Sequence, residues 1–319
     1  MSRSVLVLGD VNVDIIGKFD GFPTPGSCAY SEKPALRPGG SGLNTYVGLR
    51  KLGIDADFFT MIGEDIFGDF IKAELLTLGI EFSPKISESY STGVVFSLST
   101  NNERTFFSFR RGAADVHITY EDLSGTSLDS GILYLTGVSV VEGEETFETF
   151  LRVVEETKSS GTKIFFDPNI RKTDLVSISR IEKIIPFVDV FLPAQDELKA
   201  LFSKSDKFRF CSDLLSTGIS DIWIKRGANG CSLFSKDSCF DFPAPRVTAL
   251  ECTGAGDAFN AAVIWGYVNN LEEKEIGIYG NIYAGISTER IGAATSYPYR
   301  KEMLESKHYK SIKTGVKVS

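Results

Sequence analysis

Histidine is scarce in this chain of 319 residues, which contains only His117 and His308. So few histidines argue against a Ser-His-Asp or Cys-His nucleophile and against a metal centre built from several histidines. The five cysteines are odd in number, scattered along the chain and form no C-x-x-C pair. That distribution favours packed thiols in a reduced, cytoplasmic protein over a disulfide framework or a structural zinc site.

Long apolar runs and basic stretches are also missing. No apolar run approaches the ~18 residues that a membrane-spanning helix needs, and the run at residues 5–8 turns polar too soon for a signal peptide. The net charge of −8, without any Lys/Arg run, argues against nucleic acid or an anionic membrane as a partner. The sequence contains neither a GxxxxGK[ST] motif nor a GxGxxG motif after a strand, so a P-loop NTPase or a Rossmann dehydrogenase has no residue basis.

What the chain does contain is an alternation of short apolar runs with segments of helical spacing. The strand-like runs lie at residues 5–8, 57–61, 132–135, 163–166, 188–192 and 222–224, and the helical segments at residues 43–52, 67–78, 145–158 and 196–202. Such alternation predicts an α/β fold with a mainly parallel central sheet flanked by helices on both faces. Since no linker or repeat divides the chain, we expect one large domain, residues 1–319, with ligands beyond the carboxyl ends of the strands.

Two regions interrupt this alternation. Residues 92–100 and 104–109 are rich in β-forming residues and are joined by Asn-Asn-Glu, which is typical of a hairpin. Residues 15–38 contain four prolines and show little helical periodicity. We expect these regions to form a small β-sheet outside the main layer, and surface hairpins without a gating role are the alternative.

The most informative stretch reads ECTGAGD at residues 251–257 and leads directly into an apolar helical segment. Small residues at 254–256 permit a sharp turn, and the first turn of the helix presents unpaired N–H groups at the positive end of its dipole. The carboxylate of Asp257 lies at this point and can accept a proton. An anion hole beside a fixed base suits the deprotonation of a hydroxyl during phosphoryl transfer, whereas a bare GxGD is more often only a helix cap.

Several segments occur in the order in which one enzyme family has them. The stretch ECTGAGD resembles the DTxGAGD motif of the ribokinase-like (PfkB) carbohydrate kinases, and GGSGLN at residues 39–44 resembles their amino-terminal GGxGxN signature. Further similar segments lie at residues 11–14, 22–26, 62–68 and 167–171. The resemblance covers roughly residues 4–300. It implies a ribokinase-like α/β fold with a small β lid over the sugar, formed by segments 15–38 and 92–111.

The resemblance also implies roles for residues at matching positions on the sugar side. Asp257 would be the catalytic base, and Gly254, Ala255 and Gly256 would form the anion hole. The substrate-binding positions would be Asn12, Asp14, Gly39, Gly40, Asn44 and Arg110. Independently of the family, an Asn and an Asp two residues apart on a strand point to one face and can hold sugar hydroxyls together.

On the nucleotide side, the resemblance implies ATP and Mg²⁺ as cofactors. KRGANG at residues 225–230 resembles the family's GxxG turn near the ATP phosphates, which assigns Lys225, Gly227 and Gly230 to ATP. Asn281, on a late helix, resembles the part that borders adenine, with packing as the alternative. Glu197 resembles the glutamate of the NxxE motif, which serves Mg²⁺, and we expect it to act through water.

Three positions depart from the family pattern. Ala194 replaces the asparagine of NxxE, so Gln195 or Asp196 is a candidate to replace its side chain. Glu251 replaces an aspartate in the loops that bind a monovalent cation, which leaves K⁺ activation open. The residues that correspond to those loops are Glu251, Thr253, Gly292 and Ser296. Tyr46 stands where a small residue is common, and we expect it to narrow or reshape the pocket.

The acceptor is the least determined part. RRGAAD at residues 110–115 resembles the RxPGAD stretch of fructokinases and, more faintly, the YRxxSA stretch of 2-keto-3-deoxygluconate kinases, in which an arginine meets the substrate carboxylate. Arg110 or Arg111 would then pair with an acidic or phosphorylated acceptor, and a solvated arginine pair is the alternative.

Taken together, these observations lead us to expect an ATP-dependent kinase that phosphorylates a primary hydroxyl of a small sugar. The expected acceptor is a ketose such as fructose, followed by a 2-keto-3-deoxy sugar acid and then by ribose or a nucleoside. A non-catalytic sugar- or nucleotide-sensing protein on the same fold is the alternative from another class. A homodimer formed through the lid is left open.

Overall fold

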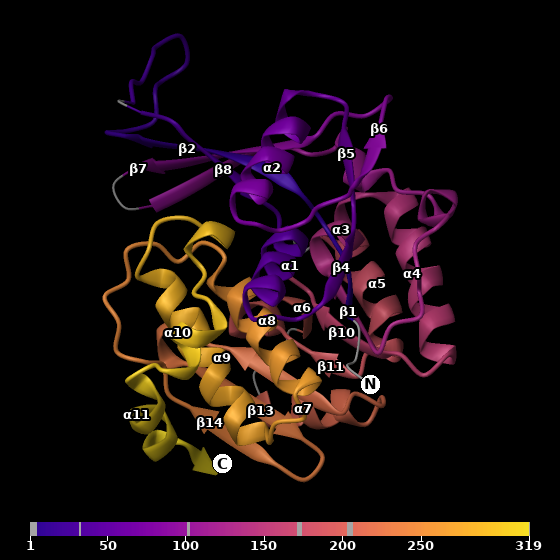
Figure 1. The fold of residues 1–319 in the computed structure, drawn as a ribbon, viewed down its shortest axis with the longest axis vertical. Coiled ribbons are helices and arrows are strands. Elements are labelled where there is room, and N and C mark those ends of the chain that lie inside the picture. Colours follow the sequence, from indigo (N-terminus) through magenta and orange to yellow (C-terminus); the bar gives the residue numbers. More distant parts are fainter. Residues whose placement is uncertain (1–4, 32, 101–102, 171–173, 203–206, 319) are drawn as a thin grey trace.

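The computed structural model describes residues 5–31, 33–100, 103–170, 174–202 and 207–318. Its centre is a nine-stranded sheet in the order β15-β14-β13-β12-β11-β10-β9-β1-β4 (Figure 1). Its strands are β1 (Val5–Leu8), β4 (Ala56–Phe59), β9 (Ile132–Thr136), β10 (Lys163–Asp167), β11 (Val190–Phe191), β12 (Asp221–Lys225), β13 (Cys231–Ser235), β14 (Cys239–Phe242) and β15 (Lys317–Val318). The strands from β4 to β12 are parallel, and β13, β14 and β15 extend the sheet antiparallel.

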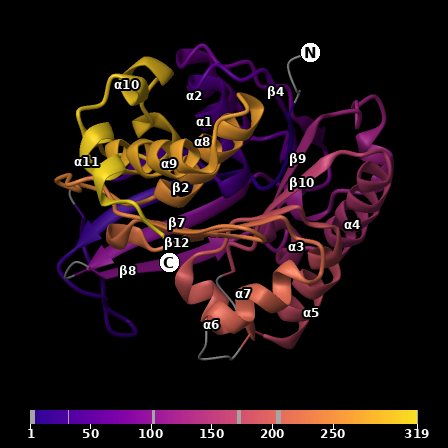
Figure 2. The ribbon, with the colours of Figure 1, turned by 90° about the horizontal axis from the view of Figure 1, so that it is seen from below.

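Helices cover both faces of this sheet (Figure 2). One layer contains α1 (Ser41–Lys51), α8 (Ala255–Val268) and α9 (Glu273–Thr288), and the other contains α4 (Glu144–Ser159), α5 (Leu175–Ile184), α6 (Gln195–Phe202) and α7 (Lys207–Leu215). Val5 and Val7 of β1 pack toward the first layer, and Leu6 and Leu8 pack toward the second. Because these strands are buried on both faces, their sequences are continuous apolar runs. The predicted α/β architecture is confirmed.

The shorter elements complete the chain. They are β5 (Met61–Gly63), α2 (Ile66–Thr77), β6 (Lys85–Ser87), α3 (Gly137–Glu142), α10 (Arg300–Leu304) and α11 (His308–Gly315). The single strand predicted at residues 57–61 is wrong, because β4 ends at Phe59 and Met61 begins β5, which pairs with β6 in a separate two-stranded sheet. Among the described residues, no helix combines the length and the apolar character that a membrane span requires.

A second sheet has four strands and projects from the body of the molecule (Figure 1). It contains β2 (Asn12–Phe19), β3 (Ala35–Gly39), β7 (Gly93–Thr100) and β8 (Glu103–Phe109) in the order β3-β2-β7-β8. Strands β2 and β7 are parallel, so two segments about eighty residues apart in sequence lie side by side, with Asn12 opposite Gly93. The predicted β-sheet outside the main layer is therefore confirmed, and we call it the lid sheet.

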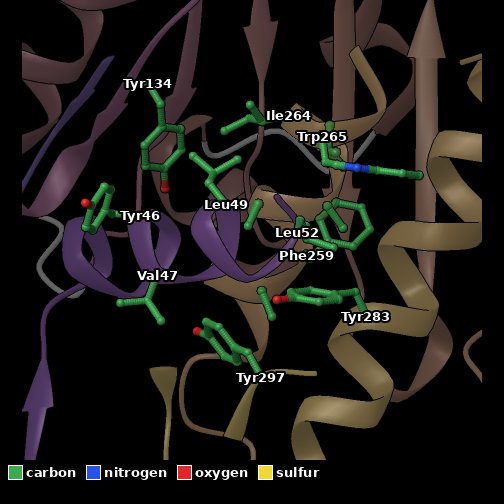
Figure 3. Close-up of a cluster of buried hydrophobic side chains, with 14 of the residues drawn as sticks. Tyr46, Val47, Leu49, Leu52, Tyr134, Phe259, Ile264, Trp265, Tyr283 and Tyr297 are labelled. Atoms are coloured by element: carbon green, nitrogen blue, oxygen red, sulfur yellow. The ribbon is translucent and has the colours of Figure 1, made fainter. Parts of the chain in front are cut away.

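Helices α1 and α8 approach each other closely within the first helical layer, where Figure 3 shows part of their shared core. A Cβ atom on Gly48 of α1 would lie only 2.7 Å from the Cβ of Ala261 on α8. Small residues at this crossing permit the short distance between the helix axes. The amino-terminal ends of the two helices, which carry the residues of the candidate site, are thereby held next to each other.

Candidate active site

The turn before α8 has a conformation that favours glycine. Gly254 has a φ of +76°, and a Cβ atom on it would lie 2.6 Å from the hydroxyl of Tyr297 and 2.9 Å from the Cβ of Ala293. Helix α8 starts immediately afterwards at Ala255, so its first-turn N–H groups and the positive end of its dipole lie at this turn. An anion can be stabilised in such a position without any positively charged side chain.

Asp257 lies in the first turn of α8 and is 8% exposed. One carboxylate oxygen accepts a hydrogen bond from the hydroxyl of Ser41 at 2.7 Å, and the other accepts from the amide nitrogen of Asn44 at 2.8 Å. Burial raises the pKa of Asp257 to about 7, although the hydrogen bonds from Asn44 and Ser41 act to lower it. A carboxylate with a pKa near neutrality is suited to general-base catalysis.

A buried aspartate fixes the start of α1. The carboxylate of Asp10 accepts hydrogen bonds from the backbone N–H groups of Ser41 and Gly42 at 2.9 and 3.0 Å, and from the hydroxyl of Thr136 at 3.3 Å. Gly40 precedes the helix with a φ of +106°. Sequence analysis missed both Asp10 and Ser41. The position of Asp10 directly after a buried strand was the one available signal, because ligands collect at the carboxyl ends of strands.

The polar pair on β2 points to one face, as predicted from its spacing. The amide nitrogen of Asn12 donates to the carboxylate of Asp14 at 2.7 Å. Gly39 lies opposite Asn12 on β3, and a Cβ atom there would lie 2.5 Å from the Asp14 carboxylate. Gly39 therefore leaves room for the Asn12–Asp14 pair, and this pair lines the pocket whereas Gly39 does not.

These residues share a pocket of about 1350 Å³ beneath the lid sheet. Its polar part contains Asp10, Asn12, Asp14, Gly40, Ser41, Asn44, Gly254 and Asp257. The lid sheet contributes alternate residues of its inner face, among them Ile16, Ser97 and Phe106. Within the described part of the chain, the buried side-chain oxygen of Asn44 has no hydrogen-bond partner. An unsatisfied acceptor in a pocket wall is suited to a hydroxyl of a ligand.

Arg110 lies in the pocket wall, but its guanidinium group is hydrogen-bonded to other residues of the protein. Its guanidinium group donates to Glu142 at 2.6 Å, to Asp115 at 2.8 Å and to the carbonyl oxygen of Val11 at 3.1 Å, and the residue is 4% exposed. The interpretation of Arg110 as a solvated arginine is therefore wrong. Arg111, at the edge of the same pocket, is exposed.

Lys225 lies at the end of β12, next to the α8 turn. Its amino group donates to the carboxylate of Asp167 at 2.5 Å, and it would lie 3.7 Å from a Cβ atom on Gly256. The turn after it depends on Gly227 and Gly230, whose φ angles are +56° and +85°. A basic group and the first turn of a helix thus face the same region, which is a suitable place for phosphate groups.

Glu197, which the family pattern assigned to Mg²⁺, lies near this ion pair, since the charges of Asp167 and Lys225 both act on it. Its carboxylate accepts hydrogen bonds from the backbone N–H groups of Ala194 at 2.6 Å and Ile170 at 3.0 Å. Burial, followed by the charge of Asp167, raises the pKa of Glu197 to about 7. Among the described residues no group of three or more His, Cys, Asp or Glu side chains could hold a metal by itself. One or two carboxylates do fit Mg²⁺, which takes its remaining ligands from water and phosphate.

Asn281 and Tyr46 do not line the pocket. The amide nitrogen of Asn281 donates to the carbonyl oxygens of Phe242 and Pro243 at 3.3 and 3.2 Å, which joins α9 to the end of β14. The expectation that Tyr46 narrows the pocket is wrong. Its ring stacks on Phe58 in the core and its hydroxyl donates to the carbonyl oxygen of Glu81 at 2.5 Å, because this face of α1 is turned to the core (Figure 3).

The residues that correspond to monovalent-cation loops are close together. The carboxylate of Glu251 accepts hydrogen bonds from the backbone N–H of Gly292 at 2.8 Å and from the hydroxyl of Thr253 at 2.9 Å. The hydroxyl of Ser296 donates to the carbonyl oxygen of Ala293 at 2.7 Å. The loop thus directs one O–H and one N–H donor at the Glu251 carboxylate, so part of its acceptor capacity is used within the protein.

The family assignment follows from comparison with known proteins. The model of the pfkB family of carbohydrate kinases matches residues 2–300, and the chain belongs to this family. It is an ATP-dependent sugar kinase. The chain is 26% identical over 321 residues to a fructokinase of Escherichia coli, which covers 96% of this chain and 100% of the relative.

Solved structures support the fold. A fructokinase with bound ATP from Xylella fastidiosa superposes with a TM-score of 0.84 at 20% identity, over 95% of this chain and 98% of the other. A ribokinase from Thermotoga maritima superposes with a TM-score of 0.78 at 28% identity, over 94% of this chain and 97% of the other. The predicted ribokinase-like fold is therefore confirmed.

Proposed function

We propose that this kinase transfers the γ-phosphoryl group of ATP to a primary hydroxyl of a small sugar, with Asp257 as the general base. The observation that carries the proposal is a buried carboxylate in the first turn of α8, whose pKa is raised to about 7 by burial. Asp257 takes the proton of the acceptor hydroxyl as its oxygen attacks phosphorus. The proton moves to the carboxylate, and the bond between the γ-phosphorus and the bridging oxygen breaks.

The turn at Gly254, Ala255 and Gly256 stabilises the negative charge on the transferred group through the N–H groups at the start of α8. Lys225 supports the same charge, because its amino group lies close to Gly256. We propose that adenine lies beside Asn281, close to the turn that contains Gly227 and Gly230. Glu197 and Asp167 would hold Mg²⁺, which would offset the charge of the triphosphate.

The sugar is held by Asn12, Asp14, Gly40 and Asn44. Asp14 accepts hydrogen bonds from sugar hydroxyls, and the unsatisfied side-chain oxygen of Asn44 accepts another. Gly40 permits close approach to the backbone at the start of α1. We propose that the lid sheet closes over the bound sugar, which removes water that would otherwise hydrolyse ATP.

The proposed acceptor is a neutral ketose such as fructose, which the similarity to fructokinases supports. Three of the five N–H donors of Arg110 are engaged by Glu142, Asp115 and Val11, and we propose that a carboxylate acceptor would depend mainly on Arg111. A 2-keto-3-deoxy sugar acid, ribose and a nucleoside remain the alternatives. An ADP-release assay over ketoses, aldoses, sugar acids and nucleosides tests the proposal. If ADP is released only with a nucleoside, the acceptor is a nucleoside and not a ketose. If ADP is released with none of these compounds, a non-catalytic sensing protein is favoured.

We also propose a homodimer formed through the outer face of the lid sheet. Its inner face lines the pocket, while Phe107 and Phe109 on the outer face are 50% and 65% exposed. Large apolar side chains gathered on one exposed face are typical of an interface. Sedimentation of Phe109→Ser should give monomers, and Leu76→Ser on α2, also exposed, is the matched control.

We propose that the protein is located in the cytoplasm, where ATP is supplied. We also propose that the chain forms one domain with a lid.

A further inference from the structure

The loop between α9 and α10 supports the turn that forms the proposed anion hole. The hydroxyl of Tyr297 donates to the carbonyl oxygen of Gly254 at 2.6 Å, and Ala293 lies against the same glycine. Tyr297 is 1% exposed and cannot rotate away without opening the core. The conformation of Gly254 therefore depends on how this loop is held.

Lys51, the last residue of α1, holds the loop. Its amino group donates to the carbonyl oxygens of Ala294 at 3.0 Å, Thr295 at 3.2 Å and Tyr297 at 3.0 Å. An ammonium group has three hydrogen-bond donors, and these three carbonyls satisfy all of them. The ring of Tyr299 lies 5.5 Å from the same nitrogen. A cage of backbone carbonyl oxygens is also what proteins use to bind a monovalent cation.

The charge of Lys51 has no carboxylate partner among the described residues. Two charged groups face it, Arg290 and Glu302, and they pair with each other. Lys51 is only 6% exposed. Burial and, next, the charge of Arg290 lower its pKa to about 8, while Glu302 opposes this shift. A buried ammonium group without a salt bridge is costly, so the carbonyl cage must be what retains it.

We propose that Lys51 is a tethered cation, whose ammonium group organises residues 294–297 and, through Tyr297, positions Gly254 without a free monovalent ion. Lys51 is a positioning residue, since it does not touch the site of phosphoryl transfer. The proposal rests on the proposed function in one respect, namely that Gly254 belongs to the anion hole. The carboxylate of Glu251 in the neighbouring loop is also engaged within the protein, because it accepts hydrogen bonds from the N–H of Gly292 and the hydroxyl of Thr253.

The decisive experiment compares wild type, Lys51→Met and Lys51→Arg in sodium, potassium and tetramethylammonium salts at equal ionic strength. We expect the wild-type rate to be the same in all three. We expect Lys51→Met, similar in length but uncharged, to lose kcat on the order of ten- to a hundred-fold with little change in KM for the sugar, because Asn12, Asp14 and Asn44 are untouched. Lys51→Arg should recover part of kcat. Lys72→Met, on exposed α2, is the matched control.

A readout that needs no turnover separates this proposal from the proposed function. Hydrogen exchange at residues 253–257 and 292–297 should become faster in Lys51→Met and remain unchanged at residues 85–87. Lys51→Ala should regain protection and rate with ethylammonium but not with ethanol. If Lys51→Met fails to fold, Tyr297→Phe, which keeps the carbonyl cage and loses only the bond to Gly254, should show the same loss of kcat.

Several results would overturn the tethered cation. They are a severalfold rise of the wild-type rate with potassium, unchanged exchange at 253–257 in Lys51→Met, or no recovery with either arginine or ethylammonium. If no acceptor gives ADP but exchange still changes as expected, the proposed function fails and the tethered cation stands.

Discussion

Asp257 and Asp14 on the acceptor side are held differently from Asp167 near the proposed phosphate site. On the acceptor side, Asp257 is bound by a hydroxyl and an amide, and Asp14 by the amide of Asn12. On the nucleotide side, Asp167 is bound by the ammonium group of Lys225 at 2.5 Å. Neutral donors leave a carboxylate able to exchange them for sugar hydroxyls or to take a proton. An ion pair fixes charge in place, which suits a region that must receive a triphosphate.

Loss of the base is the strongest test of this comparison. Asp257→Asn keeps the shape and the partners Ser41 and Asn44 but cannot take a proton. We expect kcat to fall by about 10² to 10⁴, with sugar and ATP binding largely retained. Steady-state kinetics and calorimetry measure the two effects, and Asp55→Asn, at an exposed position, is the control. More than about a tenth of wild-type kcat in Asp257→Asn would contradict the assignment.

The nucleotide side should respond in stability as well as in rate. Lys225→Met leaves Asp167 buried without its positive partner, which we expect to cost about 3 to 5 kcal/mol of unfolding free energy. Adding Asp167→Asn should restore part of that stability because the uncompensated charge is removed. Denaturant unfolding of both variants and of the double variant gives the coupling. Equal stability of Lys225→Met and wild type would show that the pair does not matter.

On the acceptor side, a smaller change should move the pH profile. The Ser41 hydroxyl stabilises the ionised form of Asp257, so Ser41→Ala should raise its pKa further above about 7. The base acts when ionised, and the acid limb of kcat/KM should therefore shift to higher pH by about one unit, with little change well above it. Ser41→Thr, which keeps the hydroxyl, should restore the profile. An unshifted limb in Ser41→Ala would separate Ser41 from the base.

The dependence of the rate on Mg²⁺ is a further test of the nucleotide side, with a smaller expected effect. Glu197→Gln should raise the Mg²⁺ concentration needed for half-maximal rate severalfold, because a carboxylate binds this ion better than an amide. Ala194→Asn should lower that concentration or leave it unchanged. A titration of rate against Mg²⁺ measures both. If neither variant shifts the titration, Mg²⁺ acts elsewhere.

Ordering of the lid sheet is the smallest expected effect. Hydrogen exchange at residues 93–100 and 105–109 should slow when sugar is present and change little with an ATP analogue alone, because the inner face of the lid sheet lines the acceptor side. Residues 132–136 of the central sheet serve as the internal reference. Equal protection with and without sugar would contradict the proposal that the lid sheet closes over the bound sugar.

Local patterns predicted the parts of the site whose partners are close in sequence. The Asn12–Asp14 pair and the glycine turn before Asp257 each depend on neighbouring residues, and their local pattern together with the family resemblance predicted them. Arg110 was harder to interpret because Glu142, 32 residues away, neutralises it. The role of Lys51 could not be predicted, since its partners are backbone carbonyls 243 to 246 residues away. Every residue type has a backbone carbonyl, so the sequence gives no indication of these partners. Likewise, the break between β4 and β5 depends on pairing with β6 rather than on local propensity.

The bond between Ser41 and Asp257 joins residues 216 positions apart, which has a consequence for synthesis of the chain. At about 5 to 20 residues per second, a ribosome needs roughly 10 to 40 s to extend the chain by the 216 positions from Ser41 to Asp257. During that interval α1 is made, but α8, which covers its apolar side, is not. The nascent chain therefore exposes Leu43, Val47 and their neighbours, which is the kind of surface that chaperones bind. The molecule becomes able to act only when its last third has emerged.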